Sequence, residues 1–205
     1  MPKTKEQFEE MRNATREKIL GAGIALFAHQ GLAATSVQDI ANAAGISTGL
    51  MYRHFKSKED LFNELVAQAA AGLAETTRAF QQEGSPRQII QQHIQEALSD
   101  LTKDDEFAQF MAVITQVFMQ EATFPAVRQL LKENDALFKA TARLIERGQT
   151  LGQFKPGGPA EMVLYYFATL QGLAIMRFTI RDRFVPPSPE IVLAFLIKDE
   201  TDERS

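Results

Sequence analysis

Residues 45–49, Gly-Ile-Ser-Thr-Gly, fit the G-x-S-x-G pattern of a nucleophile elbow, in which a strained turn exposes a reactive serine. Such an elbow follows a buried strand, and its serine needs a histidine that is oriented by a third group. The preceding residues 39–44, DIANAA, have a helical pattern instead. Of the three histidines in the chain, none lies in a motif that pairs it with Ser47. A serine hydrolase at Ser47 is therefore a remote alternative, and we expect that the protein is not an enzyme.

Metal and cofactor chemistry is not indicated by the remaining residues. The chain contains no cysteine, which removes disulfides and thiolate ligands and suits a reducing compartment. No metal-ligand spacing and no glycine-rich phosphate loop are present. We expect no cofactor and no metal site.

Ser47 fits a second role, as the N-cap of a short helix that continues to about Phe55. In that helix Met51 and Phe55 are spaced i and i+4, so they can pack on one side against the rest of the domain. The opposite side then carries residues that face outward, namely Gly49, Leu50, Tyr52 and Arg53. This composition is unusual for a solvent-facing helix and suits contact with base edges and phosphates. With a short capped helix before Gly45, the pattern predicts a helix-turn-helix.

Helical patterns with start and stop signals run along the whole chain, and no convincing strand is present. Ile19, Ile24 and Phe27 recur at helical spacing ahead of Gly31, a C-cap candidate. Two overlapping capping boxes, Thr35 with Gln38 and Ser36 with Asp39, can open the next helix. Further helices are expected at about 57–84, from 86 onward, 104–121, 125–150, 159–181 and 189–198. The sequence predicts an all-α fold of about nine helices.

Charge divides the chain into a basic head and an acidic body. The net charge is −4, yet residues 11–58 hold six basic and two acidic residues, which leaves −8 for the remainder. Such asymmetry is typical of a nucleic-acid-binding module joined to another domain. We expect a small three-helix DNA-binding domain at 1–58, a larger helical domain at 59–198, and a charged tail at 199–205.

Targeting signals are not recognised in the sequence. The N-terminus is charged from its third residue and has no apolar core of a signal peptide. The longest uncharged apolar stretch, 162–176, is interrupted by polar residues and falls short of the roughly 18 residues of a membrane span. We expect a soluble, cytoplasmic protein without membrane contact.

Across residues 16–65 the chain resembles the TetR family of bacterial transcriptional regulators. The resemblance rests on these motifs: Lys18-Ile19-Leu20, Ala25-Leu26-Phe27, Gly31, residues 35–41 (TSVQDIA), residues 44–47 (AGIS) and residues 49–61 (GLMYRHFKSKEDL). Beyond about residue 80 only the helix count, the helix lengths and the Gly148–Phe154 stretch are similar. Thr48 and Arg53 depart from the commoner residues of the family, so the resemblance implies no operator sequence.

The resemblance implies a homodimer in which each subunit places one recognition helix on half of a palindromic operator, and a small molecule that releases the DNA. Phosphate contacts are expected from helix-start hydroxyls and from polar side chains nearby: Thr35, Ser36, Ser47, Thr48, Tyr52, His54 and Lys58. Gly49 would permit close approach of the backbone. The candidates for base recognition are Gln38, Thr48, Leu50 and Arg53. Each has an alternative, because caps, packed side chains and solvated lysines occur without DNA.

The effector pocket is expected between the helices of the acidic body. The apolar candidates are Phe107, Phe110, Met111, Ile114, Phe118, Phe138, Tyr165, Phe167 and Met176, and the polar ones are His93, Gln171 and Arg177. Such stripes also fill ordinary cores, and that alternative stays open. The sequence names no ligand, although this composition suits a large hydrophobic molecule.

The dimer interface is expected at the last two helices. Residues 191–197 (IVLAFLI) are almost entirely apolar, more than a terminal helix buries on one side. Pairing with the preceding helix would give an intersubunit four-helix bundle. The interface candidates are Met162, Tyr165, Tyr166, Ile191, Val192, Phe195 and Leu196, and intrachain packing is the alternative. The sequence thus predicts a ligand-responsive repressor, with a helical interaction protein that reads no DNA as the second possibility.

Overall fold

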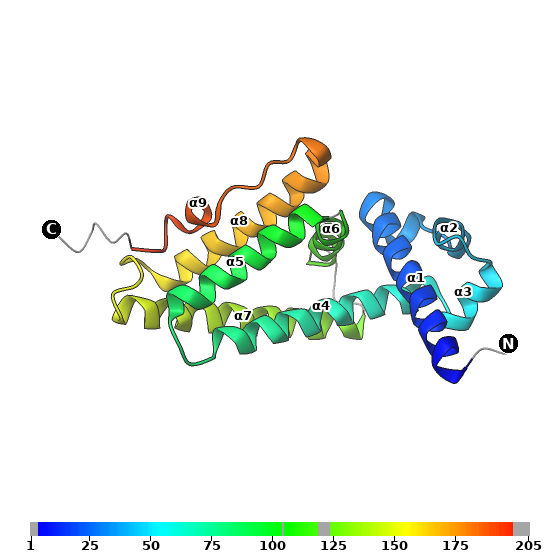
Figure 1. Ribbon diagram of the computed structural model, residues 1–205, viewed down its shortest axis with the longest axis horizontal. Coiled ribbons are helices and arrows are strands. Elements are labelled where there is room, and N and C mark those ends of the chain that lie inside the picture. The colour runs from blue at the N-terminus through cyan, green and yellow to red at the C-terminus, as the bar shows by residue number, and fades with distance from the viewer. Residues whose placement is uncertain (1–3, 104, 119–123, 199–205) are drawn as a thin grey trace.

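The computed structural model describes residues 4–103, 105–118 and 124–198, and in these ranges its named elements are all helices, joined by turns and loops (Figure 1). The elements are α1 (Lys5–Ala34), α2 (Val37–Ala43), α3 (Thr48–His54), α4 (Lys58–Phe80), α5 (Pro86–Lys103), α6 (Glu106–Phe118), α7 (Pro125–Thr150), α8 (Pro159–Ile180), the 3-10 turn η1 (Arg181–Arg183) and α9 (Pro189–Leu193). The predicted all-α class is confirmed.

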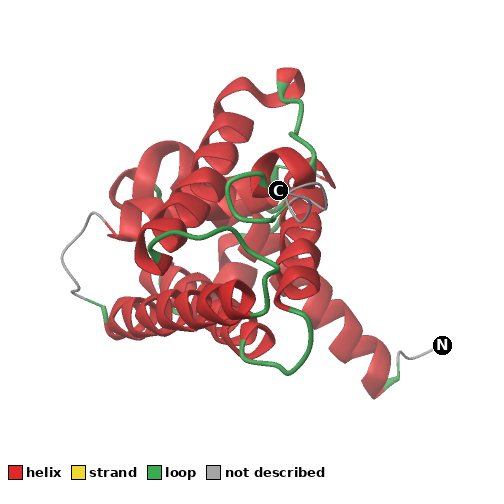
Figure 2. Ribbon diagram, turned by 90° about the vertical axis from the view of Figure 1, so that its left-hand side faces the viewer, coloured by secondary structure: helices red, strands yellow, loops and turns green. Residues whose placement is uncertain are grey.

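The molecule is elongated, with a small head at one end. Helices α1, α2 and α3 form this head, and α9 lies towards the opposite end (Figure 1). Helices α4 and α7 run side by side along the molecule, and they make the most extensive helix pairing of the described chain. The view turned by 90° shows that the described residues consist of helices joined by loops (Figure 2).

Two apolar cores hold the fold together. The first joins α1, α2 and α3 to the first half of α4 and also takes Val113, Val117 and Leu130 from α6 and α7. The second fills the body between α5, α7, α8 and α9. The predicted domain boundary at residue 58 therefore falls at the start of α4, within a core that the head shares with the body.

Serine caps begin several helices, and one of the predicted caps is wrong. Ser57 accepts from the amide of Asp60, and Ser85 accepts from the amide of Gln88 directly before α5. Of the two overlapping capping boxes the structure uses Ser36 with Asp39. The prediction of a cap by Thr35 is wrong, because its hydroxyl donates instead to the main-chain oxygen of Gly31. Gly31 has φ of 77°, which interrupts α1 where a helix stop was predicted.

The C-terminal region is less helical than predicted. Helix α9 ends at Leu193, so the expected helix over 189–198 is too long. Beyond it the chain pairs with the turn after α7, where the amide of Lys155 donates to Leu196 at 2.8 Å and Phe154 forms a β-bridge with Ile197. These pairings use main-chain groups that a continued helix would need for itself.

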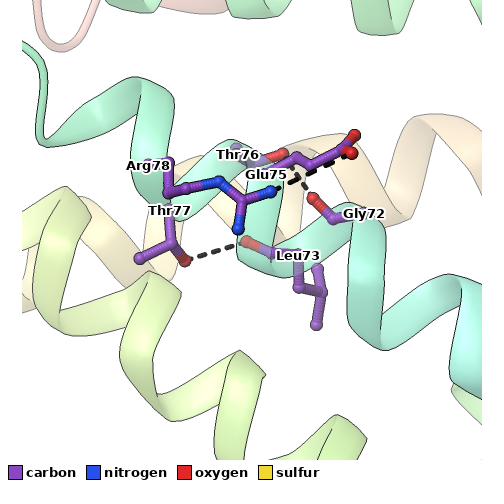
Figure 3. A network of polar contacts seen from close by, with 6 residues as sticks. All are labelled: Gly72, Leu73, Glu75, Thr76, Thr77 and Arg78. Carbon is purple, nitrogen blue, oxygen red and sulfur yellow. Dashed lines mark hydrogen bonds and ion pairs between the residues drawn. The ribbon is translucent and has the colours of Figure 1, made fainter.

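The far half of α4 satisfies its hydroxyl groups within the helix (Figure 3). Thr77, which is buried, donates to the carbonyl of Leu73 at 2.8 Å, and Thr76 donates to Gly72 at 3.1 Å. Such back-bonding removes the cost of burying a hydroxyl that lacks a partner. It leaves α4 continuous from the head to the far end of the body.

Helix α8 is apolar but poorly covered by its own chain. By length and composition alone, the segment 159–183 could cross a membrane. The mean hydropathy is 1.3, and only 17 % of its most apolar 18-residue stretch is buried in the protein. It is one such helix among the described residues, which is weak support for a membrane span. Its inward side, with Val163, Tyr166 and Ala174, packs into the body core, and its outward side stays exposed.

Candidate nucleic-acid interface

Helices α2 and α3 are joined by a tight turn at Gly45. Gly45 has φ of 68°, a conformation that residues with a Cβ rarely adopt. The amide of Gly45 donates to Asn42 at 3.1 Å, and the amide of Ile46 donates to Ala41 at 2.9 Å. The turn therefore reverses the chain within a few residues and sets α3 across α2, as a helix-turn-helix requires.

Ser47 caps α3, since its hydroxyl oxygen accepts from the amide of Leu50 at 3.2 Å. The segment before it is the helix α2 and not a strand. A nucleophile elbow is therefore wrong for residues 45–49. The prediction that Met51 and Phe55 anchor α3 is confirmed, because they are 0 % and 5 % exposed in the head core.

The other side of α3 faces outward. Gly49, Tyr52 and Arg53 are exposed, and Thr48 and Leu50 are half-buried. A Cβ added to Gly49 would meet no described atom closer than the Ser47 hydroxyl oxygen at 4.0 Å. Packing within the described chain therefore does not require glycine at position 49. An approaching partner would be a reason for it.

A cavity of about 420 Å³ lies beside this face, where the ends of α1 and α3 meet the starts of α2 and α4. It brings together four of the residues predicted to contact phosphates, Thr35, Ser36, Tyr52 and Lys58. Lys56 also lines it and was missed from the sequence, although its place directly before the cap Ser57 could have indicated it. The cavity offers a cation, a phenol and two helix starts to an anion.

Not every predicted polar group in this region is available. Thr35 is 1 % exposed, and its hydroxyl donates to the main-chain oxygen of Gly31 and accepts from the side-chain amide of Gln30. The Ser36 hydroxyl bonds to the Asp39 carboxylate at 2.6 Å, and these bonds hold the pKa of Asp39 below its usual value. The structure thus gives both hydroxyls intrachain partners.

Lys58 has a different role from the predicted one. Its ammonium group donates to the main-chain oxygens of Leu32, Ala33 and Thr35 at 2.8, 3.2 and 2.8 Å. An ammonium has three hydrogens, so all are used, and a cation at the C-terminal end of α1 also complements the helix dipole. Lys58 therefore joins α4 to α1, and no hydrogen remains for a phosphate in this arrangement.

His54 ends α3 beside the first turns of α1. Burial, with Arg12 and Arg16 nearby, lowers the pKa of His54 from its usual value. Arg16 bonds to Glu64 at 2.9 Å and lies 4.5 Å over the ring of Phe55. A second cavity, of about 550 Å³, opens here towards α7. Arg16 thus fixes the end of the helix-turn-helix to α4.

Gln38 lies on the exposed side of α2, where its side-chain amide donates to Asn42 at 2.8 Å. The two amides form an exposed pair one turn apart. Gln38 keeps its second N–H and its amide oxygen for a further partner.

The residues predicted to line an effector pocket divide into separate groups. Phe107, Met111, Phe138 and Phe167 border the body core, where Phe138 and Phe167 stack at 4.8 Å. Ile114 and Phe110 instead pack on the core shared with the head. Tyr165 and Met176 are exposed on α8, so they do not point into the body. Phe118 lies outside the residues whose side chains are described.

The polar candidates of the body already have partners. Nδ1 of His93 lies 2.6 Å from the Tyr166 hydroxyl, and burial lowers the pKa of His93 to about 4 and raises that of Tyr166. Gln171 donates to Thr115 at 3.0 Å. The structure also pairs Arg177, whose partners are Asp105 at 2.6 Å and the Leu101 carbonyl at 3.0 Å.

Some of the residues predicted to form the dimer interface are buried in their own chain, and others are exposed. Tyr166, Val192 and Leu196 are buried in their own chain, so they cannot present a surface to a second subunit as predicted. Tyr165 and Ile191 are exposed. Among the half-buried residues, Phe195 packs edge-on against Tyr165 at 4.5 Å and Met162 covers Gly157. Only part of the predicted set is therefore accessible.

Known proteins resemble this chain most clearly in the head. Residues 19–65 match the family model of bacterial regulatory proteins, tetR family. The chain is 32 % identical over 114 residues, 55 % of its length, to the HTH-type transcriptional regulator AcrR of Shigella flexneri, and it spans 51 % of that relative. It is 48 % identical over 54 residues to the HTH-type transcriptional repressor KstR2 of Mycobacterium tuberculosis, which is 26 % of this chain and 27 % of that protein.

The fold is shared over a much longer range. The structure of the ketosteroid transcriptional regulator KstR2 of M. tuberculosis superimposes with a TM-score of 0.69 at 22 % identity, over 90 % of this chain and 95 % of that one. The match therefore includes the helical body as well as the head. The matched head sequence and the capped helix-turn-helix show that the head of this chain, over residues 19–65, belongs to the TetR family of bacterial regulatory proteins.

Proposed function

We propose that the protein is a ligand-responsive repressor that binds a palindromic DNA operator as a homodimer in the cytoplasm. The observation that carries the proposal is the outward face of α3, which is anchored by buried Met51 and Phe55 yet leaves Tyr52 and Arg53 exposed. A short helix held in this way can enter the major groove, which admits one α-helix. The chain spans about half of its AcrR relative, so the activity is inferred from this geometry.

Base recognition is assigned to the exposed side of the helix-turn-helix. Arg53 can donate two hydrogen bonds to a guanine, and Leu50 can cover a thymine methyl group. Gln38, with its amide oriented by Asn42, can bond to an adenine. Thr48, at the start of α3, can bond to a base edge or to a phosphate.

Backbone binding is assigned to groups around the cavity beside α3. The Ser47 hydroxyl accepts within the helix cap and keeps its hydrogen for a phosphate oxygen. Tyr52 and Lys56 supply a phenol and an ammonium from the cavity wall, and His54 lies half-buried at the end of α3. Thr35 and Ser36 are reassigned to the support of the start of α2, since both hydroxyls are engaged and the main-chain amide of Ser36 donates to the Asp39 carboxylate at 2.9 Å. Lys58 is reassigned to the support of this surface.

The second subunit is expected to cover the exposed side of α8. The residues on this side follow one helical face and have small residues at the centre: Leu164, Tyr165, Ala168, Gly172, Ile175 and Met176. A Cβ added to Gly172 would meet nothing within 4 Å in its own chain, so the two small residues can let another helix approach closely. A dimer that reads both half-sites needs recognition helices about 34–36 Å apart.

Sedimentation at micromolar concentration tests this interface with a matched pair of variants. Leu164→Arg places a charge on the exposed side of α8 and should give monomers. Leu131→Arg changes an equally apolar, exposed residue on α7 and should leave the dimer intact. Dimers with Leu164→Arg, or monomers with both variants, would place the interface elsewhere.

The effector is proposed to be a small apolar molecule bound beside the stacked rings of Phe138 and Phe167. The polar groups at hand, His93 with Tyr166 and Gln171, are uncharged and could orient one polar group of the ligand. For release, the ligand must bind the DNA-free arrangement more tightly than the bound one.

Selection of binding sites from random duplexes with the purified protein tests the proposal. A repressor of this type should enrich a palindrome, and extracts of metabolites should release it. On the selected site, Tyr52→Phe and Lys56→Ala should weaken binding to every sequence, and Lys56→Ala should reduce the salt slope by about 0.9. Arg53→Ala should relax preference at one position by about 1–3 kcal/mol. No enrichment of any sequence would favour the alternative, a helical interaction protein.

A further inference from the structure

The first turns of α1 project beyond the head and are exposed on every side. Each residue from Lys5 to Ala14 is exposed, and the buried positions of α1 begin at Ile19. The projecting part is nevertheless a properly started helix, because Thr4 and Gln7 form a complete capping box. Three unpacked turns gain little stability from their own chain, since short helices are marginal in water. Their order is therefore a reason to look for a partner.

The basic and acidic residues on these turns lie mostly on different sides of the helix. Lys5, Arg12 and Arg16 follow one row along α1, whereas Glu6, Glu10 and Glu17 follow a parallel row about 120° away. Glu9 lies one turn from both Lys5 and Arg12, about 40° and 60° from them around the helix, and borders the basic row between these two cations. We call Lys5, Arg12 and the neighbouring Phe8 the α1 ridge. Phe8 is 59 % exposed.

The α1 ridge lies on the same side as the end of α3. Arg16, the next member of the row, lies over the ring of Phe55 directly after α3. Arg12 is near enough to His54 to contribute to the lowering of its pKa. The N-terminus of α1 also lies at the same end of the molecule as α2 and α3 (Figure 1). The ridge thus continues the head surface past α3.

We propose that the α1 ridge is a second DNA-binding surface, which contacts the phosphate backbone beside the groove occupied by α3. This inference rests on the proposed function. From Arg16 to Lys5 the helix extends about 16 Å, more than the roughly 12 Å width of the major groove, so Lys5 and Arg12 can reach the strand beyond its edge. Neither cation has a hydrogen bond or an ion pair within the described part of the chain.

Charge complementarity selects this partner over others. A phosphate strand is a row of negative charges that matches cations spaced along a helix, and the acidic row of α1 would then face away from it. Phe8 can lie against deoxyribose between the two cations. The ridge would enlarge the footprint of each subunit without reading sequence, because contacts to phosphates position a protein and carry no base information.

Salt titration on the selected operator tests the α1 ridge with the full chain. Lys5→Ala with Arg12→Ala should weaken binding and make the slope of log affinity against log salt shallower by about 1.8. The control Lys18→Ala with Lys132→Ala removes the same charge from exposed positions off the ridge and should leave the slope unchanged. Alanine favours helix, so circular dichroism should report an unchanged helix content in both variants.

Duplex length gives a second, independent measurement. Adding about 10 base pairs on each side of the selected site should strengthen binding by the wild-type chain and not by the ridge variant. Equal slopes for the ridge variant and the control, with the wild-type chain still binding its operator, would overturn the ridge and leave the proposed function intact. A ridge variant that altered sedimentation but not DNA binding would assign the ridge to a second copy. If the wild-type chain selected no DNA, both proposals would fail.

Discussion

The ammonium nitrogen of Lys58 lies 2.8 Å from the main-chain oxygen of Leu32 and fastens the first turn of α4 to the last turn of α1. Lys58→Met keeps the length of the side chain but leaves three carbonyl groups without this donor. We expect the free energy of unfolding to fall by about 1.5–3 kcal/mol, the range for hydrogen bonds to charged groups. Urea denaturation measures this change.

Lys56 offers the matched control for that substitution, since it is exposed two residues earlier. Lys56→Met should leave the free energy of unfolding within about 0.5 kcal/mol of the wild-type value. DNA binding should respond in the opposite way. In salt titrations on the selected operator, the slope of log affinity against log salt should become shallower for Lys56→Met and stay unchanged for Lys58→Met. A stable Lys58→Met protein with a reduced slope would return Lys58 to the phosphate contacts.

Gln116 connects the body to the head, because its side-chain amide donates to the main-chain oxygen of Ala28 at 3.3 Å. Gln116→Leu removes this bond between α6 and α1. We expect the free energy of unfolding to fall by about 1 kcal/mol and amides near the end of α1 to exchange hydrogen faster. Gln171→Leu breaks the neighbouring bond from α8 to Thr115 and should not change exchange in α1. Equal exchange in both variants would show that the bond from Gln116 to Ala28 does not hold the end of α1.

Local signals explain why most helices could be predicted. Ser47, Ser57 and Ser85 start helices through bonds to residues three positions later, and Gly45 turns the chain through its own φ. These interactions are contained in a few consecutive residues, so a single sequence reveals them. The apolar spacing of Met51 and Phe55 likewise determines which side of α3 stays outside.

Competing partners, some of them far along the chain, explain the differences from prediction. The hydroxyl of Thr35 could have capped α2, but it bonds back to Gly31, and its carbonyl oxygen accepts from Lys58. Helix α9 stops early because the segment around Lys155, some forty residues before it, pairs with the chain there. An apolar residue such as Val192 is expected both in a dimer interface and in the core of a single chain, so its type does not separate the two. Only the packing of the chain distinguishes these cases.

The buried His93 predicts a dependence of stability on pH. Burial lowers its pKa in the folded chain to about 4, whereas an unfolded histidine titrates near 6.5. Below pH 6.5 the unfolded chain therefore binds a proton that the folded chain does not bind until about pH 4. Stability is complete above pH 6.5 and falls as the pH decreases towards 4, by about 2 kcal/mol between pH 7 and 5.

His93→Asn separates this histidine from the other titrating groups. Asparagine has a polar atom where Nδ1 faces the Tyr166 hydroxyl but takes up no proton. Urea denaturation at pH 7 and pH 5 should therefore show a smaller loss for the variant than for the wild-type chain. His54, whose pKa is also lowered, remains in both proteins. An identical loss in both would mean that His93 is protonated in the folded chain at pH 5.

Two helical glycines should respond in opposite directions to the same substitution. A Cβ on Gly148 would lie 2.1 Å from a ring carbon of Phe154, which is itself buried, so Gly148→Ala must displace that ring. We expect a loss of about 1–3 kcal/mol from overpacking. A Cβ on Gly72 in the middle of α4 would meet nothing within 4 Å, so Gly72→Ala should stabilise the protein by about 0.8–1 kcal/mol through helix propensity. Thermal denaturation should thus give a lower Tm for the first variant and a higher Tm for the second, and shifts of the same sign would contradict the close contact of Gly148 with Phe154.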